Sequence, residues 1–282
     1  MSKFLNNLVK LMNLSIIIVN YNTKNLLQDC LKSIYTLYHK PYTLEIIVVD
    51  NGSTDGSLQS INSLKWPNLR IITNKKNEGF AKAVNQGIRQ SIGKNILLLN
   101  SDIVVKKDAL VKLLAFVENH PQAGLVGGRF LNPDGSPQGS CFFLPTLWRV
   151  VKEFWFGDKG FSVVKKYVPE GKGPSEVEAV TGAVFLIPKK VLSKVGFFNE
   201  RYFMYFEDLD YCRRVRQAGF KVYYLPEAEF IHEHGASGRS IPQQTHRWLV
   251  ESSKIYHGTI KYYLITFIIW LGQKCQKILK KK

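Results

Sequence analysis

The chain has 282 residues, of which 45% are hydrophobic and 22% are charged, so it can bury a large core as an ordinary globular protein does. Its formal net charge of +17 is unusual and favours an anionic partner: nucleic acid, an acidic membrane surface or a phosphate-rich substrate. The four cysteines are scattered and form no CxxC pair, which argues against a zinc site or a disulfide framework and fits a reducing cytosol. The N-terminus has no small-residue cleavage site, so no signal peptide is expected.

Strands and helices alternate in the first 120 residues. Strands are predicted over residues 14–19, 44–49, 70–72 and 95–99, and helices over residues 26–38, 81–92 and 108–119. The first two strands are continuous β-branched apolar runs, which is typical of strands buried on both faces of a parallel sheet. The pattern therefore predicts βαβ units and an α/β fold.

The second half is less regular. Residues 132–174 are rich in glycine, proline and aromatic residues, and we expect irregular structure with short helices there. A strand is predicted over residues 177–187, with a turn signal at Thr181-Gly182 in its middle, and another over residues 221–225. Helices are predicted over residues 188–195 and 208–218, and Gly219 would end the second one.

The C-terminal segment is basic. From Pro242 to the end it has eight lysine and arginine residues and one acid, Glu251. A helix is predicted over residues 255–271, but its apolar run at 262–271 is shorter than the ~20 residues that span a bilayer. The favoured interpretation is a helix on an anionic leaflet, anchored by Tyr262, Tyr263 and Trp270. The alternative is a helix packed on the body, followed by a solvated lysine tail.

Polar residues follow three of the predicted strands: Asn20-Tyr21-Asn22, residues 50–56, and Asn100-Ser101-Asp102. The carboxyl ends of parallel strands meet at one edge of a sheet, where ligands bind. Each segment could also be a simple turn. Aspartate oxygens suit Mg²⁺ or Mn²⁺, and because no glycine-rich phosphate loop is present, a metal would have to neutralise a bound diphosphate. His232 and His234 could complete the metal shell, although a lone histidine is more often structural.

Three acids, Glu207, Asp208 and Asp210, lie within four residues and follow the apolar run Phe203–Phe206. Adjacent acids repel one another, so the pKa of one of them is expected to be raised. A carboxylate in such surroundings is a candidate general base. The simpler interpretation is a solvated acidic first turn of a helix, where negative charge favours the helix dipole.

Five segments together resemble a family 2 glycosyltransferase of the GT-A fold, and its bacterial rhamnosyltransferase-like members in particular. They are SIIIVNYNTKNLLQDCLKSI, EIIVVDNGSTDGS, NKKNEGFAKAVNQGI, ILLLNSDIVV and the stretch from VTGAVFLI to HEHGAS, and they cover about residues 14–240 in order. The LLN-x-D and H-x-x-G-x-S segments and the basic aromatic tail carry the rhamnosyltransferase likeness. The resemblance implies a mostly parallel, Rossmann-like sheet flanked by helices, with a catalytic domain over residues 1–240. A basic amphipathic helical segment that associates with membranes would follow over residues 241–282.

The resemblance also implies a role for each matching residue. Asp208 would be the catalytic base, and Glu207 beside it would contact the acceptor or the donor sugar. Asp102 would bind the metal, Mg²⁺ or Mn²⁺, with Asn100 at the first position of the DxD motif and His232 nearby. The nucleotide-sugar would be bound by Tyr21, Asp50, Asn51, Ser53, Asn77, Gly79, Ala81, Asn85 and Ser101. Asn100 departs from the usual aspartate and supplies less charge to a metal.

The activity implied is inverting transfer of a sugar from a nucleoside-diphosphate sugar, with dTDP-rhamnose as the candidate donor. The acceptor would be a hydroxyl of a lipid-linked or surface-polysaccharide glycan, which places the enzyme in the cytoplasm on the anionic inner face of the cytoplasmic membrane. Two alternatives stay open: a catalytically inactive glycan-binding or scaffold relative, and a nucleic-acid-binding protein. The basic excess is most concentrated in the tail and is not interleaved with aromatics on the body, which argues against nucleic acid.

Overall fold

The four strands of the first half form the parallel part of the sheet. The computed structural model describes residues 13–36, 43–64, 66, 68–155, 166–233 and 242–279. β1 (Asn13–Asn20) pairs in parallel with β2 (Thr43–Asp50) and β4 (Asn95–Asn100), and β2 pairs with β3 (Leu69–Thr73). The register places Asn20 opposite Asp50 and Val19 opposite Asn100. The predicted α/β fold is confirmed, and three polar strand ends lie side by side.

Strands of both directions complete the sheet, whose order is β3-β2-β1-β4-β11-β6-β12-β5 among the described residues. β11 (Val184–Pro188) runs antiparallel to β4 and to β6 (Ala123–Leu131), and β12 (Lys221–His232) lies parallel to β6. The short strand β5 (Ile103–Val105) forms the edge, β7 (Pro137–Gln138) pairs with β6, and β9 (Ser175–Val177) pairs with β12. The sheet is therefore mixed, with its parallel half next to the polar segments.

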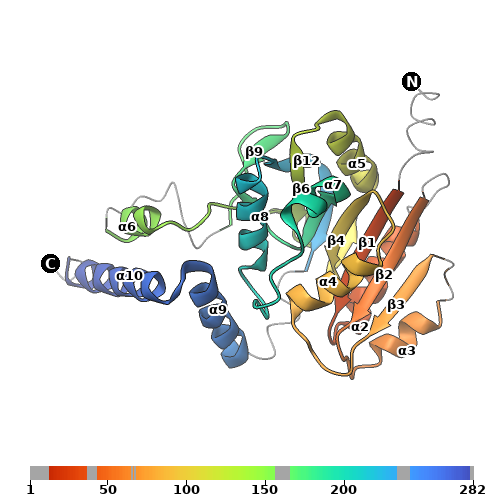
Figure 1. The fold of residues 1–282 in the computed structure, drawn as a ribbon, viewed down its shortest axis with the longest axis horizontal. Coiled ribbons are helices and arrows are strands. Elements are labelled where there is room, and N and C mark those ends of the chain that lie inside the picture. The colour runs from red at the N-terminus through yellow and green to blue at the C-terminus, as the bar shows by residue number, and fades with distance from the viewer. Residues whose placement is uncertain are drawn as a thin grey trace.

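Helices cover both faces of this sheet (Figure 1). α2 (Lys24–Thr36), α3 (Ser57–Asn62) and α5 (Ala109–Asn119) pack on one face, where their apolar residues join one core cluster. α4 (Phe80–Gln90), α7 (Lys189–Val195) and α8 (Glu207–Gln217) pack on the other face and form a second cluster. This three-layer arrangement accounts for the all-apolar strands, which are buried on both sides.

The expected strand over residues 177–187 is wrong, because the chain divides it into three. β9 joins the main sheet, β10 (Ala179–Val180) pairs with β8 (Cys141–Phe142) in a separate two-stranded sheet, and β11 follows a turn at Gly182-Ala183. The predicted turn position is thus close to the observed one. The strand expected over residues 221–225 continues to His232, with its pairing interrupted by a register shift between Leu225 and Glu229.

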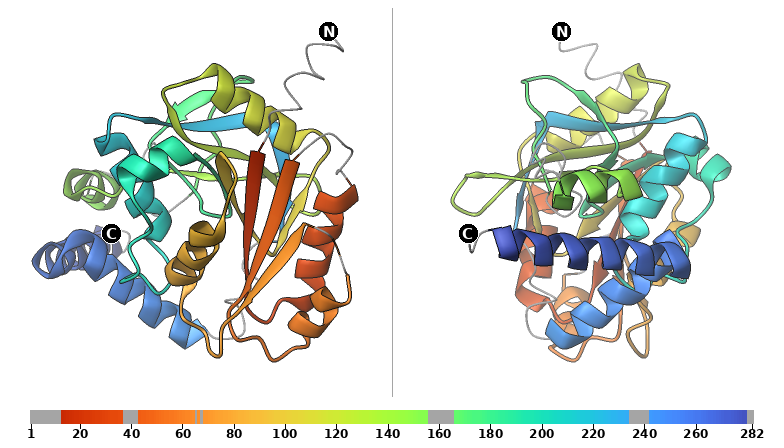
Figure 2. Two further views of the ribbon diagram at one scale, coloured as in Figure 1. Left: turned by 45° about the vertical axis from the view of Figure 1, so that its right-hand side comes forward. Right: turned by 90° about the vertical axis from the view of Figure 1, so that its left-hand side faces the viewer.

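The C-terminal segment consists of two helices, so the prediction of one helix over residues 255–271 is wrong. α9 (Pro242–His257) ends before Gly258, whose φ of 79° only glycine adopts readily, and α10 (Thr259–Leu279) follows. α9 packs on the body, whereas α10 packs against α6 (Leu147–Trp155) at one side of the molecule (Figures 1 and 2). In the described part of the chain, every helix is too short or too polar to cross a bilayer. The division at residue 240 and His234 lie outside the described residues, and the two-domain boundary stays a prediction.

Candidate active site

A network of buried hydrogen bonds organises the ends of β1 and β2. Asn20, at the end of β1, donates from Nδ2 to Asp50 Oδ1 (2.8 Å) and to Ser53 Oγ (3.0 Å). The Ser53 backbone N–H donates to the other carboxylate oxygen of Asp50 at 3.1 Å. Thr23 donates to Asn20 Oδ1 and lies 2.8 Å from Ser101 Oγ, which connects this network to the end of β4. Asp50 and Ser53 therefore shape the turn that presents Tyr21.

A second network holds the segment before α4. Asn51 Oδ1 accepts from the Asn74 side chain and the Glu78 backbone, and Asn51 Nδ2 donates to Asn77 Oδ1 at 2.9 Å. The Gly79 N–H donates back to Asn77 Oδ1 at 3.0 Å. These bonds position Asn51 and Asn77 at the mouth of the sheet, where both remain part of a pocket.

Gly79 allows α4 to meet the loop before α8. Its φ is 88°, and a Cβ atom there would lie 2.8 Å from the Phe203 carbonyl oxygen. The next residue, Phe80, donates its backbone N–H to that same oxygen at 2.7 Å. A larger residue at position 79 would separate the two segments, so the glycine is needed for close approach.

These strand ends and loops line one pocket, called here the strand-end pocket. One part of its lining is polar and comprises Tyr21, Asn51, Asn77, Asn100, Ser101 and Asp102. The other part is apolar and comprises Val19, Phe80, Phe203, Met204 and Trp248. The pocket thus combines the polar ends of three parallel strands with an apolar wall, as ligand sites commonly do.

Asp102 is the acid of this pocket. Its side chain is nearly buried, and Oδ1 has no hydrogen-bond partner. His232 Nε2 lies 3.6 Å from this oxygen, and burial is the main reason why the pKa of Asp102 is raised to about 6. A buried carboxylate oxygen without a donor, facing an imidazole nitrogen, fits a divalent cation. No cluster of three or more His, Cys, Asp and Glu side chains that could hold a metal occurs in the described part of the chain, so other ligands would have to come from amides, water or substrate.

Gln138 of β7 orients the imidazole of His232. Its Oε1 lies 2.5 Å from His232 Nδ1, and its Nε2 donates to the His232 carbonyl oxygen at 3.1 Å. The chain separates these two residues by 94 positions. No local pattern in the sequence indicates this contact.

The loop before α8 is strained and is supported by α9. Tyr205 and Phe206 have φ angles of 72° and 65°, which cost bulky residues of order 1–3 kcal/mol each. Ser252 of α9 donates to the Met204 carbonyl oxygen at 2.8 Å, and the ring of Trp248 stacks on that of Phe203 at 4.7 Å. The surrounding structure holds the loop in this conformation, and such strain is typical of functional sites.

The three acids of α8 have different environments. Asp210 forms ion pairs with Arg213 (2.7 Å) and Arg214 (2.9 Å), so its charge is structural. Glu207 is buried, its Oε2 has no partner, and burial followed by repulsion from Asp208 raises its pKa to about 8. Burial also raises the pKa of Asp208. The expectation that one of these acids has a raised pKa is confirmed, and the interpretation as a solvated first turn is wrong for Glu207.

Asp208 is anchored beside the pocket by the turn before β11. Its Oδ2 accepts the Gly182 N–H at 3.2 Å, and its Oδ1 accepts the Leu209 N–H at 2.8 Å. The adjacent Ala183 carbonyl accepts the Asn100 N–H at 3.0 Å. One turn therefore connects the candidate base to the DxD-like segment.

The structure brings some of the predicted residues together and separates others. Six of them line the strand-end pocket, and His232 faces Asp102. Ala81 is buried, and the buried Asn85 bonds through its amide to Phe198 and Glu200. Sequence reasoning missed Gln138, the apolar wall and Lys166, whose charge acts on both Asp102 and Asp208. The apolar run before Glu207 was the one sequence feature that could have indicated the apolar wall, because it contains Phe203 and Met204.

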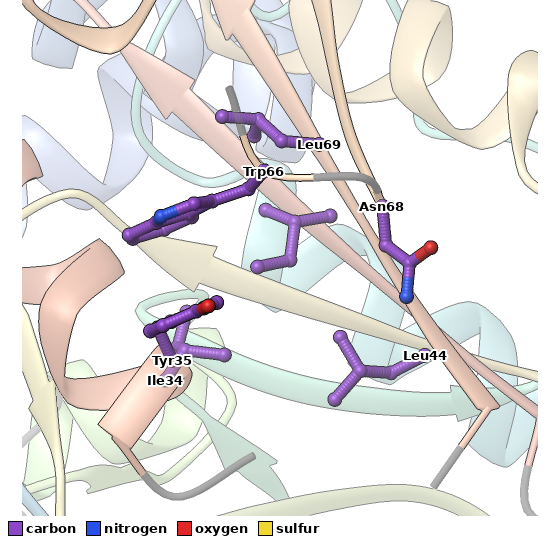
Figure 3. A pocket seen from close by; sticks show the side chains of 7 residues that line it. Ile34, Tyr35, Leu44, Trp66, Asn68 and Leu69 are labelled. Atoms are coloured by element: carbon purple, nitrogen blue, oxygen red, sulfur yellow. The ribbon is translucent and has the colours of Figure 1, made fainter. Parts of the chain in front are cut away.

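A second, apolar hollow lies at the other end of the strands (Figure 3). Tyr35 at the end of α2 stacks on Trp66 with ring centroids 4.5 Å apart and planes 8° from parallel. The remaining lining residues are Ile34, Leu44, Ile46, Asn68 and Leu69. This apolar hollow sits at the amino ends of β2 and β3, away from every residue of the polar networks.

Comparisons with known proteins agree with this geometry. Residues 15–141 match the family described as Glycosyl transferase family 2, and residues 95–279 match Glycosyl transferase family group 2. An N-acetylglucosaminyl-diphospho-decaprenol L-rhamnosyltransferase of Mycobacterium tuberculosis is 30% identical over 237 residues, covering 78% of this chain and 75% of that protein. The dTDP-rhamnosyl transferase RfbF of Shigella flexneri is 25% identical over 228 residues, covering 79% and 70%.

Solved structures support the fold. GalNAc-T7 with UDP, GalNAc and Mn²⁺ superposes with a TM-score of 0.62 at 17% identity, covering 79% of this chain and 44% of that one. The mannosyltransferase PcManGT of Pyrobaculum calidifontis, with GDP-Man and Mn²⁺, has a TM-score of 0.59 at 16% identity, covering 91% and 64%. The predicted GT-A fold and rhamnosyltransferase likeness are confirmed: this chain belongs to glycosyltransferase family 2 and is a glycosyltransferase.

Proposed function

We propose that the protein transfers a sugar from a nucleoside-diphosphate sugar to an acceptor hydroxyl with inversion at the anomeric carbon. The observation that carries this proposal is the strand-end pocket, where three polar strand ends and the unpartnered Asp102 Oδ1 lie beside an acid pair of raised pKa. The polar strand ends and Asp102 would bind the nucleotide and its diphosphate, and the acid pair would supply the catalytic base.

Asp208 is the base of this proposal. A raised pKa makes its carboxylate a better proton acceptor, and the two backbone N–H donors hold it in one orientation. The acceptor hydroxyl proton passes to Asp208 as the acceptor oxygen bonds to the anomeric carbon. The bond from that carbon to the diphosphate oxygen breaks in the same displacement, which inverts the configuration.

Glu207 and Lys166 set the electrostatics around this base. Glu207 is buried beside Asp208, and repulsion between the two acids favours keeping Glu207 protonated while Asp208 is ionised. Protonated Glu207 can donate a hydrogen bond to a sugar hydroxyl. The cationic Lys166, which is half-buried, stabilises the carboxylate of Asp208 and also acts on Asp102.

Asp102 would hold a divalent cation, Mg²⁺ or Mn²⁺, with His232 and Asn100 beside it. When bound, such an ion supplies Lewis-acid stabilisation of the charge that develops on the leaving diphosphate. Asp102 contributes its buried oxygen without competing protein donors, and His232 contributes a nitrogen 3.6 Å away. Asn100 leaves the site one negative charge short of a two-aspartate motif.

dTDP-rhamnose is the proposed donor. Two relatives are named as rhamnosyltransferases, one of them as a dTDP-rhamnosyl transferase. The apolar wall formed by Phe80, Phe203, Met204 and Trp248 suits a 6-deoxy sugar, because its methyl group replaces a hydroxyl that would need a partner. The acceptor is proposed to be a lipid-linked or surface-polysaccharide glycan at the cytoplasmic face of the membrane. The name of the mycobacterial relative, which contains a diphospho-decaprenol, supports the lipid-linked acceptor.

A donor panel tests this proposal. Purified protein with Mn²⁺ is mixed with dTDP-rhamnose, UDP-glucose, UDP-N-acetylglucosamine and GDP-mannose, and the released nucleoside diphosphate is measured with and without a polyprenyl-diphosphate-N-acetylglucosamine acceptor. We expect acceptor-dependent release from dTDP-rhamnose and its loss in Asp208→Asn. Release from another donor alone would overturn the rhamnose assignment. Donor binding without turnover of any donor would favour the inactive relative.

A further inference from the structure

The second C-terminal helix is apolar on two opposite faces. Ile265 and Gly272 are buried on one side of α10, a helix that packs against α6 and α9. Ile260, Tyr263, Leu264, Phe267 and Trp270 are 45–88% exposed. Their spacing of three, one, three and three places them on one face of a helix, called here the docking face. A helix in water normally presents polar residues there.

Exposed large apolar side chains are concentrated on the docking face. Of the eleven exposed large apolar side chains in the described residues, five lie on the docking face, and a sixth, Trp148, lies on the neighbouring helix α6. The remaining five, such as Ile92 and Phe197, belong to different elements. Contiguous apolar surface of this kind marks an interaction site.

The lysines on and beside α10 indicate what binds the docking face. α10 contains three lysines, Lys261, Lys274 and Lys277, and no acid, and three further lysines follow it in the sequence. Lys254 of α9 lies 5.3 Å from the Tyr263 ring, and Lys274 lies 4.6 Å from the Trp270 ring. A second copy of α10 would bring lysines together without an acidic partner. An anionic lipid surface accepts both the apolar residues and the lysines.

We propose that the docking face seats the protein on an anionic lipid surface. The proposal deepens the proposed function by naming the surface on which the enzyme meets a lipid-linked acceptor, and it rests on that function only for the choice of acceptor. Of the three anchors predicted from the sequence, Tyr263 and Trp270 are exposed on the docking face, whereas Tyr262 is half-buried on α10.

Vesicle flotation of the full chain tests the docking face. Vesicles of equal parts phosphatidylglycerol and phosphatidylcholine should bind the protein, and vesicles of phosphatidylcholine alone should bind it far less. Phe267→Ser/Trp270→Ser should weaken binding about ten-fold or more, because the apolar area that enters the lipid is removed. The matched control is Ile92→Ser, an exposed apolar residue distant in sequence, which should bind normally.

Replacing lysines by glutamates, which reverses their charge, gives a second, independent measurement. Lys254→Glu/Lys274→Glu changes the two lysines that lie over docking-face rings, leaves the apolar residues in place, and should weaken binding to the anionic vesicles by more than about twenty-five-fold, because each lysine near such a surface contributes about five-fold. Equal binding to both vesicle types, or unchanged binding by both double variants, would overturn the proposal. The proposal would also be overturned if the protein did not bind vesicles but formed a dimer in sedimentation velocity, and if Phe267→Ser/Trp270→Ser dissociated that dimer.

Nucleotide release with a water-soluble acceptor should be unchanged in these variants. Its absence in the unmutated protein would count against the proposed function alone.

A different observation concerns the proton of His232. The Ser136 hydroxyl donates to Asp134 Oδ1, and Asn132 Nδ2 donates to Ser136 Oγ at 2.9 Å. Asn132 Oδ1 therefore faces Gln138 Nε2, which donates to it at 2.7 Å. This chain of hydrogen bonds fixes the amide orientation of Gln138, so Gln138 Oε1 accepts a hydrogen bond from the N–H at His232 Nδ1.

We infer that Gln138 is a positioning residue for the metal site. With a proton on Nδ1, His232 directs Nε2 toward Asp102 Oδ1, 3.6 Å away, and in the neutral ring this nitrogen carries the lone pair. This is the tautomer that can share a cation with Asp102. Gln138 acts through His232 and lies outside the lining of the strand-end pocket.

Two readouts test this inference without measuring transfer. Nitrogen-15 NMR of the metal-free protein should show the His232 proton on Nδ1, and Gln138→Leu should shift it toward Nε2. Mn²⁺ affinity, measured by electron paramagnetic resonance, should fall about ten- to a hundred-fold in Gln138→Leu. Gln138→Glu keeps the acceptor and should retain affinity. If Gln138→Leu does not fold, Asn132→Leu releases the same amide and should weaken Mn²⁺ binding to a smaller degree. A proton on Nε2 in the unmutated protein, or an unchanged Mn²⁺ affinity, would refute the assignment.

Discussion

The two ends of the parallel strands have opposite chemistry. At the carboxyl ends, the strand-end pocket contains amides, an aspartate without a donor, and a neighbouring loop with left-handed aromatic residues. At the amino ends, the apolar hollow contains stacked aromatic and aliphatic side chains with no ionisable group other than the Tyr35 phenol. The amino ends of the strands thus contribute to stability, whereas the carboxyl ends contain an unpaired buried carboxylate oxygen and strained backbone, which lower it. Sites of function characteristically break local rules in this way.

The difference predicts opposite outcomes of mutation. Removing a charge at the carboxyl ends should abolish activity and leave stability equal or higher. Removing an aromatic side chain at the amino ends should lower stability and leave catalysis unchanged. The following variants test this contrast.

Asp208→Asn should produce the largest effect. Sugar transfer should fall by roughly 10²–10⁴-fold because the proton acceptor is lost, while donor binding measured by calorimetry stays nearly normal. The melting temperature should not fall, because a buried charge beside Glu207 is removed. Asp210→Asn is the matched control and should instead lower stability, because it breaks two ion pairs. Near-normal transfer by Asp208→Asn would move the role of base to Glu207.

Asp102→Ala should abolish transfer and remove its dependence on a divalent cation. The lost stabilisation of the leaving diphosphate amounts to several kcal/mol. Nucleotide release is measured over a Mn²⁺ titration, with excess EDTA as the blank. Asn100→Asp is the opposite change and should tighten Mn²⁺ binding, since it adds a carboxylate. Full activity of the unmutated protein in EDTA would rule out a metal at this position.

Glu207→Gln should stabilise the protein at alkaline pH. The pKa of Glu207 rises from its ordinary value of 4.5 to about 8. The folded state therefore holds this proton more tightly, so stability is highest below pH 4.5 and is lost as the pH rises through 8. At pH 9, Glu207→Gln should increase the free energy of unfolding by more than about 1.4 kcal/mol, the equivalent of one pKa unit.

Denaturant unfolding at pH 5 and pH 9 measures this gain. The matched change at the exposed Glu170 should give the same free energy as the unmutated protein at both pH values. An equal effect of Glu207→Gln at the two pH values would show that its proton is not retained on folding.

Trp66→Ala should have the smallest effect. Losing the stack on Tyr35 should cost about 1–2 kcal/mol, seen as a lower midpoint in chemical denaturation. The kinetics of transfer should not change, and Trp66→Phe should recover most of the stability because a second ring remains. A change in the KM for the donor would mean that the two ends of the strands are not independent.

The parallel half of the fold and much of the site follow from local patterns in the amino-acid sequence. Continuous apolar runs identify β1, β2 and β4, and the polar residues that follow them must meet at one edge. This accounts for Tyr21, Asn51 and Ser101 in the strand-end pocket. The acidic run after four apolar residues likewise located the acid pair, because local repulsion can be recognised from spacing alone.

Features that depend on the close approach of distant segments could not be predicted from local patterns. β6 escaped prediction because its glycines mask a strand pattern, yet a Cβ atom on Gly127 would lie 2.9 Å from Val180 and one on Gly128 would lie 2.4 Å from the Phe230 ring. These glycines serve the packing of neighbours that are far away in the sequence. No local periodicity carries that information.

Tertiary structure also decided which distant side chains complete the site. Trp248 comes from a helix that sequence reasoning assigned to a separate tail, and it reaches the pocket because α9 packs on the strained loop. Gln138 meets His232 only because β7 and β12 both pair with β6. Local patterns determine which elements form and which ends are polar. Long-range packing and the need to satisfy buried polar groups determine which partners those ends meet.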